Sequence, residues 1–222
     1  MTTPANQPQA DTNPVPSTPS LLLPPIKRYR TVDLCAGAGG LSTGLEEAGF
    51  EVVCAAEYDK MAAATYRLNH PATIVIEGDI TLPKTKEAIV AACGDSPIDA
   101  LVGGCPCQSF SIASSSRAGI QDPRGQVFFA YMHILQILKP KLAVAENVPN
   151  LLNYPDAMQS ILSIFNHLGY YAEYRVLNAA DHGTPQERKR LFFVATKIDF
   201  RNASILWPQP QFAPAAKKAV EQ

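Results

Sequence analysis

The run VDLCAGAGG at residues 32–40 predicts a strand, a tight turn and the start of a helix in immediate succession. Its apolar beginning is typical of a strand, and its three glycines allow backbone amides to approach a ligand closely. The third glycine of the dinucleotide-binding fingerprint would fall at position 42, which is occupied by Ser42. The missing third glycine argues against a nicotinamide cofactor, while the three glycines that are present still predict a turn that binds a ligand.

Outward from this run, short β-type segments alternate with segments of helical periodicity. Such alternation predicts an α/β fold of the Rossmann-like type, with a mostly parallel sheet and helices on both faces. Two later segments, residues 171–177 and 191–195, are expected to close the sheet as an antiparallel pair. The parallel strands are expected at residues 32–35, 52–56, 74–76, 100–102 and 142–145.

The composition of the 222-residue chain fits one globular domain with flanking tails, since 46% of the residues are hydrophobic and 18% are charged. Residues 1–26 are rich in Pro, Thr and Ser. Such a segment cannot offset its ordering entropy by burial, so we predict that it is a disordered tail. We expect residues 27–200 to form the domain and residues 201–222 to form a C-terminal tail.

Neither an apolar run of about 18 residues nor a signal-peptide pattern occurs, so we expect no membrane span and a cytoplasmic location. The 5 cysteines are then expected to be reduced thiols rather than a disulfide framework. The net charge of −1 leaves no basic footprint on the chain as a whole. Any surface for nucleic acid must therefore be local or supplied by a partner.

Acidic residues follow two of the predicted parallel strands. Glu57 ends the second strand and Asp79 follows the third. Ligands bind outside the carboxyl ends of the strands in sheets of this kind. Glu57 is placed where a ribose hydroxyl pair would be held, and Asp79 could accept a hydrogen bond from an adenine amino group. Taken alone, Glu57 could equally be a surface carboxylate and Asp79 a helix cap.

A candidate nucleophile, Cys107, lies directly after Pro106 on a small-residue loop that follows the fourth predicted strand. Glycines on this loop let a planar ligand approach the backbone, and the proline fixes the direction of the chain. A lone cysteine is more often buried and inert. No second pair of thiols matches Cys105 and Cys107, so no zinc site is predicted and Cys105 is assigned to packing only.

Three further charged residues complete the predicted chemistry. Glu146 ends the fifth strand, where it could supply a proton or a strong hydrogen bond. Arg188 and Arg190 are two residues apart at the edge of the last strand and are expected to point the same way, toward a base oxygen or a phosphate. The alternatives are a helix-start carboxylate for Glu146 and a solvated charge run for the arginines.

The signatures PCQ at residues 106–108, ENV at residues 146–148 and QERKR at residues 186–190 follow one another along the chain. With the glycine-rich turn, they resemble the cytosine-C5 DNA methyltransferases, which are class I, S-adenosylmethionine-dependent enzymes. The resemblance implies that Cys107 attacks the cytosine ring, that Glu146 engages N3, and that the two arginines steady the base. It implies catalytic roles for Cys107, Glu146, Arg188 and Arg190, cofactor contacts from Asp33, Cys35, Gly37, Gly39, Gly40, Glu57, Asp79 and Pro106, and substrate contacts from Gln108, Ser111, Asn147 and Gln186.

Two departures from the family pattern are expected to matter. An aromatic residue usually occupies the position of Cys35, so cofactor binding is expected to be weakened or compensated elsewhere. Family members flip the target base out of the duplex with a target-recognition region that follows the arginine motif, and a final helix then completes the cofactor pocket. We expect both to be absent from this chain.

Four hypotheses about function follow from this pattern. The first is one chain of a split, restriction-modification-type DNA methyltransferase, with a second polypeptide that carries target recognition. The second is a truncated and inactive chain. The third is a non-catalytic module that binds cofactor or nucleic acid. The fourth is a tRNA cytosine methyltransferase, because one branch of the family modifies tRNA.

Overall fold

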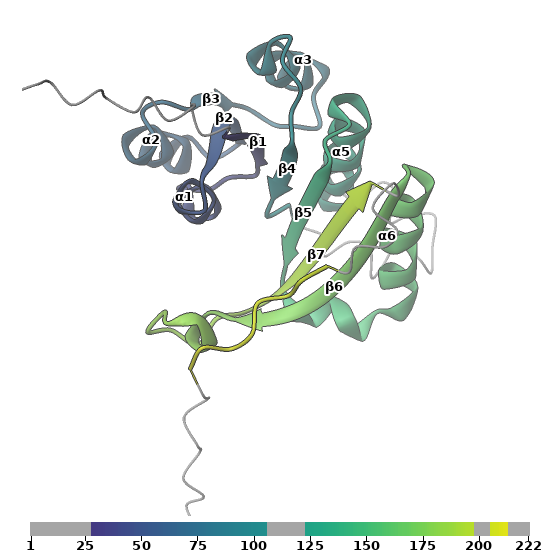
Figure 1. Ribbon diagram of the computed structural model, residues 1–222. Coiled ribbons are helices and arrows are strands. Elements are labelled where there is room, and N and C mark those ends of the chain that lie inside the picture. The colour runs from purple at the N-terminus through teal and green to yellow at the C-terminus, as the bar shows by residue number, and fades with distance from the viewer. Residues whose placement is uncertain (1–27, 106–122, 198–204, 213–222) are drawn as a thin grey trace, which may run out of the picture.

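The computed structural model describes residues 28–105, 123–197 and 205–212. These residues form a seven-stranded sheet in the order β3-β2-β1-β4-β5-β7-β6, whose strands are labelled in Figure 1. The strands are β1 (Tyr29–Leu34), β2 (Phe50–Glu57), β3 (Ile74–Glu77), β4 (Ala100–Gly103), β5 (Leu142–Asn147), β6 (Tyr170–Asn178) and β7 (Lys189–Lys197).

The strands β1 to β5 pair in parallel, and β7 is antiparallel to both of its neighbours, β5 and β6. The predicted mostly parallel sheet with an antiparallel closing pair is therefore confirmed. β7 enters between β5 and β6, so the last strand of the sheet along the chain is an interior strand. The strand predicted at residues 32–35 extends one residue too far, because β1 ends at Leu34 and Cys35 has a φ of 54°, which is outside the strand region.

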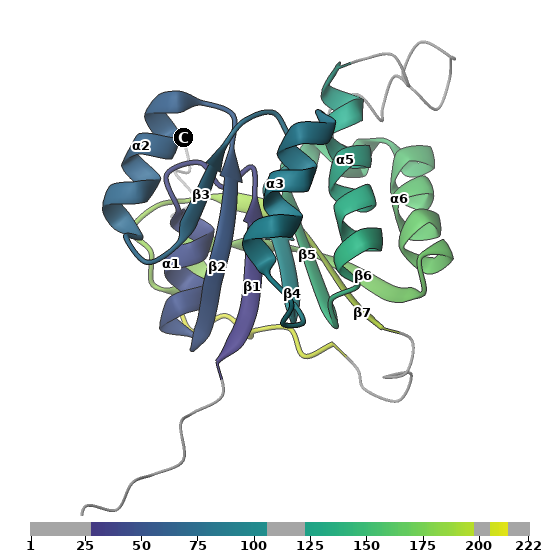
Figure 2. The ribbon, with the colours of Figure 1, turned by 90° about the horizontal axis from the view of Figure 1, so that it is seen from above.

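Helices cover both faces of the sheet (Figure 1), as the alternating pattern predicts. One face carries α1 and α2, and the other carries α3, α5 and α6, of which α3 and α5 lie in front of the strands in Figure 2. None of the helices among the described residues is long and apolar enough to cross a membrane. The helices are α1 (Gly40–Glu47), α2 (Lys60–Asn69), α3 (Pro83–Cys93), α5 (Pro123–Leu138) and α6 (Pro155–His167), with short 3-10 turns η2 (Pro149–Asn153) and η3 (Ala179–His182).

The core lies between the sheet and the helices α5 and α6. Phe128, Ile134 and Phe165 from these helices are at most 1% exposed. The buried Tyr131 hydroxyl lies 3.2 Å from the Leu101 carbonyl oxygen and 3.1 Å from that of Val144. A buried phenol needs such partners, and this one ties α5 to the two central strands β4 and β5.

This architecture brings the carboxyl ends of β1, β2, β3, β4 and β5 to one edge of the sheet, because all five strands run in the same direction. The amino-terminal end of the reversed strand β7 meets the carboxyl-terminal end of β5 at the same edge, since Leu191 pairs with Asn147. Among the described residues, Glu57, Asp79 and Glu146 lie at or directly after strand ends on this edge.

Candidate active site

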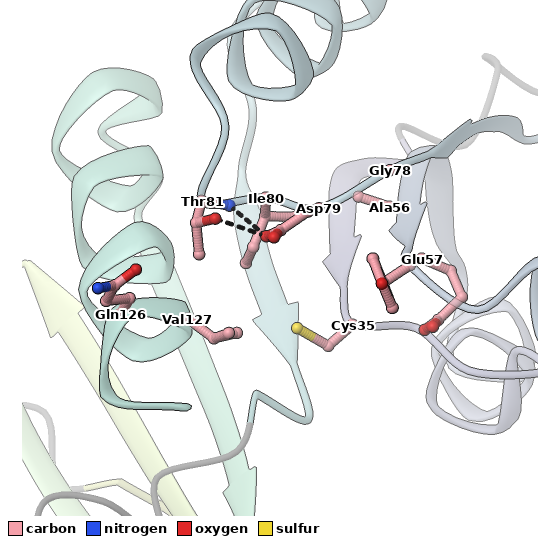
Figure 3. A pocket seen from close by; sticks show the side chains of 10 residues that line it. Cys35, Ala56, Glu57, Gly78, Asp79, Ile80, Thr81, Gln126 and Val127 are labelled. Atoms are coloured by element: carbon pink, nitrogen blue, oxygen red, sulfur yellow. Dashed lines mark hydrogen bonds between the residues drawn. The ribbon is translucent and has the colours of Figure 1, made fainter. Parts of the chain in front are cut away.

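A pocket of about 370 Å³ opens at the carboxyl ends of β1, β2 and β3. Figure 3 shows its side chains converging from the strand ends on one side and from α5 on the other. The pocket combines two carboxylates with an apolar wall, which is the composition expected of a site for a mixed polar and apolar ligand. It is lined by Cys35, Ala56, Glu57, Tyr58, Gly78, Asp79, Ile80, Thr81, Gln126 and Val127.

Glu57, the last residue of β2, connects the strand end to the glycine-rich turn. Its Oε2 accepts a hydrogen bond of 2.7 Å from the Gly37 N–H, and its Oε1 accepts one of 2.8 Å from the Asp59 N–H. Each carboxylate oxygen can accept more than one hydrogen bond. Glu57 is therefore held rigidly at the pocket while retaining acceptor capacity for a ligand.

Asp79 also lines the pocket, directly after β3. Its Oδ1 accepts hydrogen bonds from the Thr81 N–H at 2.8 Å and from the Thr81 hydroxyl at 2.7 Å, both drawn in Figure 3. Two donors from one residue fix the orientation of the carboxylate. Sequence reasoning placed Asp79 and Glu57 near one ligand, and the structure brings both to one pocket.

Asp33 has a different place from the one that sequence reasoning assumed. It is 1% exposed in the middle of the sheet, and the Ser42 hydroxyl donates to its Oδ2 at 2.7 Å. Asp33 is not among the residues that line the pocket, and its Oδ1 has no hydrogen-bond partner among the described residues. Burial raises the pKa of this carboxyl from 3.8 to about 7, although the Ser42 hydrogen bond and His70 oppose the rise. Asp33 thus contacts the start of α1 through the Ser42 hydroxyl.

His70 is a structural residue that braces the glycine-rich turn. It is 4% exposed, with Nε2 3.1 Å from the Gly39 carbonyl oxygen and Nδ1 3.0 Å from Glu46 Oε2. Gly39 has a φ of 97°, and a Cβ built there would lie 2.3 Å from His70 Nε2. A glycine is therefore required at position 39 by its backbone conformation and by the imidazole.

The carboxylate of Glu146, at the end of β5, forms an ion pair with Arg190. Arg190 Nε lies 2.8 Å from Glu146 Oε1, and the two side chains are 25% and 20% exposed. Arg190 stands at the start of β7, which pairs with β5. The structure thus joins two predicted site residues that are 44 positions apart in the sequence.

Arg188 does not share the position of Arg190. It precedes β7, its side chain is exposed, and its N–H donates to Asn178 Oδ1 at 3.0 Å. Gln186 is also exposed, in the turn before β7, where its N–H donates to the Thr184 carbonyl oxygen at 2.8 Å. The sequence predicts that Arg188 and Arg190 point the same way. In the structure, Arg190 forms the ion pair with Glu146, whereas the Arg188 side chain is exposed.

The residues directly before the predicted nucleophile loop are anchored to the end of β5. The Nδ2 of the buried Asn147 donates to the Cys105 carbonyl oxygen at 3.2 Å. A Cβ built on Gly104 would lie 3.3 Å from Glu146 Oε2, so the backbone passes close to this carboxylate. The predicted residues Pro106, Cys107, Gln108 and Ser111 lie outside the described residues.

Sequence reasoning missed several residues of the pocket wall. Tyr58 could have been found, because it follows Glu57 directly. Gln126 and Val127 belong to α5 and face the strand ends across the pocket (Figure 3), and no local sequence signal indicates that approach. The remaining predicted cofactor residue, Gly40, is exposed and begins α1. No cluster of three or more His, Cys, Asp or Glu suited to a metal ion occurs in the part of the chain that the structure describes.

A family model for C-5 cytosine-specific DNA methylases matches residues 29–222. The type II methyltransferase M.NgoPII of Neisseria gonorrhoeae is 45% identical over 174 residues, which are 77% of this chain and 48% of that protein. The type II methyltransferase M.AquIA of Picosynechococcus is 37% identical over 198 residues, which are 84% of this chain and 78% of that protein. The chain thus spans about half the length of M.NgoPII and most of M.AquIA.

Two solved structures are similar to this fold. A prophage-encoded E. coli protein described as a DNA modification methyltransferase has a TM-score of 0.66 and 30% identity, covering 78% of this chain and 48% of that one. The S. pombe Dnmt2 methyltransferase has a TM-score of 0.61 and 23% identity, covering 82% and 52%. At 23% identity, the similarity to the S. pombe protein shows a shared fold and nothing more.

Proposed function

The chain belongs to the C-5 cytosine-specific DNA methylase family, and we propose that it transfers a methyl group from S-adenosylmethionine to C5 of cytosine in DNA. The observation that carries this proposal is the Glu146–Arg190 ion pair, which lies beside the backbone leading to Cys107. The pair stands at the same edge of the sheet as the pocket that holds Glu57 and Asp79. On this proposal, the ion pair would serve the base and the pocket would hold the cofactor, at one edge of the sheet.

The pocket fits S-adenosylmethionine by the chemistry of its lining. Glu57 would accept hydrogen bonds from the ribose hydroxyls, because it is fixed by two backbone N–H groups and keeps free lone pairs. Ile80 and Val127 offer an apolar wall to the adenine, and Asp79 lies within the same pocket. When bound, the cofactor supplies an electrophilic methyl group on a sulfonium centre.

The side chains of this chain would activate the base. Cytosine C5 is a poor nucleophile, and addition of the Cys107 thiolate to C6 turns the ring into an enamine. Glu146 would hold a proton or a strong hydrogen bond at N3, where charge develops. Arg190 would position Glu146, since it contacts this carboxylate at 2.8 Å. Asn147 would keep the loop entrance in place through the Cys105 carbonyl.

A second polypeptide would supply target recognition and complete the cofactor pocket. A duplex base must be flipped out before a site of this kind can reach it. The comparison with M.AquIA supports a short catalytic chain, because this chain covers 78% of that type II methyltransferase and 48% of M.NgoPII. On this proposal residues 27–200 form the catalytic domain, and the basic DNA surface lies largely on the partner, in keeping with the net charge of −1.

The test is methyl transfer from radiolabelled S-adenosylmethionine to cytosine-containing DNA, with the chain alone and with the product of the adjacent reading frame. We expect transfer only in the mixture, and none to tRNA. Transfer to tRNA in place of DNA would refute the substrate. A folded protein that binds the cofactor but transfers no methyl group in either condition would refute the enzymatic proposal.

The covalent step has its own test with DNA that contains 5-fluorocytosine, on which the adduct should persist. We expect Cys107→Ser to abolish the adduct and Cys105→Ser, two residues earlier, to keep it. An adduct that survives Cys107→Ser would refute the assignment of the nucleophile. Cys105→Ser is the matched control because it removes a thiol from the same strand-to-loop connection.

A further inference from the structure

Two thiols meet at the wall of the candidate active site: Cys35 lines the pocket, and Cys105 is assigned to packing only. Cys35 Sγ lies 2.8 Å from Cys105 Sγ, although the two residues are 70 positions apart in the sequence, and no disulfide joins them. Their proximity follows from the sheet, because Leu34 at the end of β1 pairs with Gly103 at the end of β4. Each cysteine comes one or two residues after these strand ends. A disulfide requires about 2.05 Å between sulfurs, so an approach of under about 1 Å would suffice.

The two thiols differ in their access to solvent. Cys35 is partly exposed and lines the cofactor pocket, into which its side chain points in Figure 3. Cys105 is 3% exposed. A small oxidant in the pocket would therefore reach Cys35 first, and Cys105 is placed to react with the product. This division into an accessible cysteine and an adjacent resolving cysteine is typical of redox-sensitive sites.

The other described cysteines give an internal contrast. Burial raises the pKa of the Cys54 thiol to about 12, and burial also raises the pKa of Cys93. Thiolates react with oxidants faster than thiols, so a raised pKa slows the oxidation of these two groups at neutral pH. Neither of them lines the cofactor pocket. Of the described cysteines, Cys35 is therefore the one that an oxidant in the pocket meets first.

We propose that Cys35 and Cys105 form a reversible disulfide that lowers the affinity of the pocket for its cofactor. The bond would fasten the glycine-rich turn to the entrance of the loop that carries Cys107, and it would fix a pocket-lining side chain in a new position. The effect on cofactor affinity rests on the proposed function, whereas the formation of the bond does not. By reciprocity, bound cofactor should shift the thiol–disulfide equilibrium toward the two thiols.

The reaction balances with a peroxide as oxidant. The Cys35 thiolate attacks one oxygen of hydrogen peroxide, the O–O bond breaks, and hydroxide leaves and is protonated to water. The Cys105 thiolate then attacks Sγ of the resulting sulfenic acid, the S–O bond breaks, and a second water leaves. The two electrons lost by the sulfurs reduce the peroxide, so two thiols and one peroxide give one disulfide and two waters. A dithiol such as dithiothreitol reverses the bond by exchange.

The bond is tested by a peptide map of the full chain after treatment with hydrogen peroxide. Remaining thiols are blocked with N-ethylmaleimide, and the unreduced digest is sequenced by mass spectrometry. We expect a crosslink between Cys35 and Cys105 in the wild type and in Cys107→Ser, and none in Cys105→Ser. A wild type without this crosslink, or with a crosslink to Cys107 in its place, would overturn the proposal.

The switch is tested by calorimetry with S-adenosylmethionine in the Cys107→Ser background, so that oxidation of Cys107 cannot contribute. We expect peroxide to lower the affinity roughly 10-fold, a coupling of ordinary size, and dithiothreitol to restore it. The added change Cys105→Ser should remove this response. A crosslinked protein with unchanged affinity would overturn the switch. If the reduced protein does not bind S-adenosylmethionine, the proposed cofactor fails and the switch with it, while the peptide map still decides the disulfide.

Discussion

Replacement of Asp33 by asparagine is expected to stabilise the protein at alkaline pH, with little effect under acidic conditions. The carboxyl is 1% exposed, and one of its oxygens is buried with no hydrogen-bond partner in the part of the chain that the structure describes, so burial raises its pKa from 3.8 to about 7. As pH rises between these values, the unfolded chain ionises Asp33 while the folded chain keeps it protonated. The folded state therefore loses stability with rising pH through this window, and the loss is complete above about pH 7.

The magnitude follows from the same pKa values. Each pH unit corresponds to about 1.36 kcal/mol, so the interval between 3.8 and about 7 amounts to about 4 kcal/mol in the free energy of unfolding. Asparagine imitates the protonated carboxyl and cannot ionise. In urea unfolding between pH 4 and pH 9, the free energy of unfolding of the variant should exceed that of the wild type by an amount that grows up to about pH 7 and then stays constant.

A control and a refutation complete this experiment. Asp95→Asn removes a carboxylate from an exposed loop and reports the effect of one lost surface charge. We expect no comparable pH-dependent gain from it. If Asp33→Asn and the wild type differ by the same amount at pH 5 and pH 8, Asp33 is ionised in the folded protein, and the reasoning from burial fails.

Three further predictions concern the glycine-rich turn and the two halves of the site. Gly39→Ala should lower the free energy of unfolding by about 2 kcal/mol or more in urea titrations, because its Cβ would meet the His70 ring at 2.3 Å. Gly37→Ala, whose Cβ would meet nothing within 4 Å, should cost only about 1 kcal/mol, and equal costs would contradict this account. Glu57→Gln should weaken S-adenosylmethionine binding roughly 10-fold in calorimetry, and unchanged affinity would exclude Glu57 as a cofactor contact. Arg190→Ala should lower kcat for methyl transfer about 100-fold with unchanged cofactor affinity, and a change in cofactor affinity alone would contradict its positioning role.

The sheet could be predicted from the sequence because its signals are local. Apolar segments such as residues 100–102 end at residues that suit turns, and parallel strands separated by helices must place their carboxyl ends on one edge. Glu57, Asp79 and Glu146 could be located for the same reason. Their shared edge is a consequence of topology and needs no knowledge of side-chain packing.

The remaining features depend on contacts that no local pattern records. The Glu146–Arg190 pair depends on the register between β5 and β7, and that register is set by long-range pairing. Asp33 lies in a strand that is buried on both faces, so alternation does not reveal which way its side chain points. The approach of Cys35 to Cys105 likewise joins two strand ends that the sequence separates by 70 positions.

The interior position of β7 has a consequence for biosynthesis. A nascent chain can pair β1 to β5 while it emerges from the ribosome. The side of β5 that later pairs with β7 stays unpaired until β7, which carries Arg190, has been synthesised and has entered between β5 and β6. We expect incomplete translation products to retain a carboxylate without its guanidinium partner. On the proposed function, the catalytic apparatus is completed late in synthesis, and premature release of the polypeptide would yield proteins unable to modify DNA.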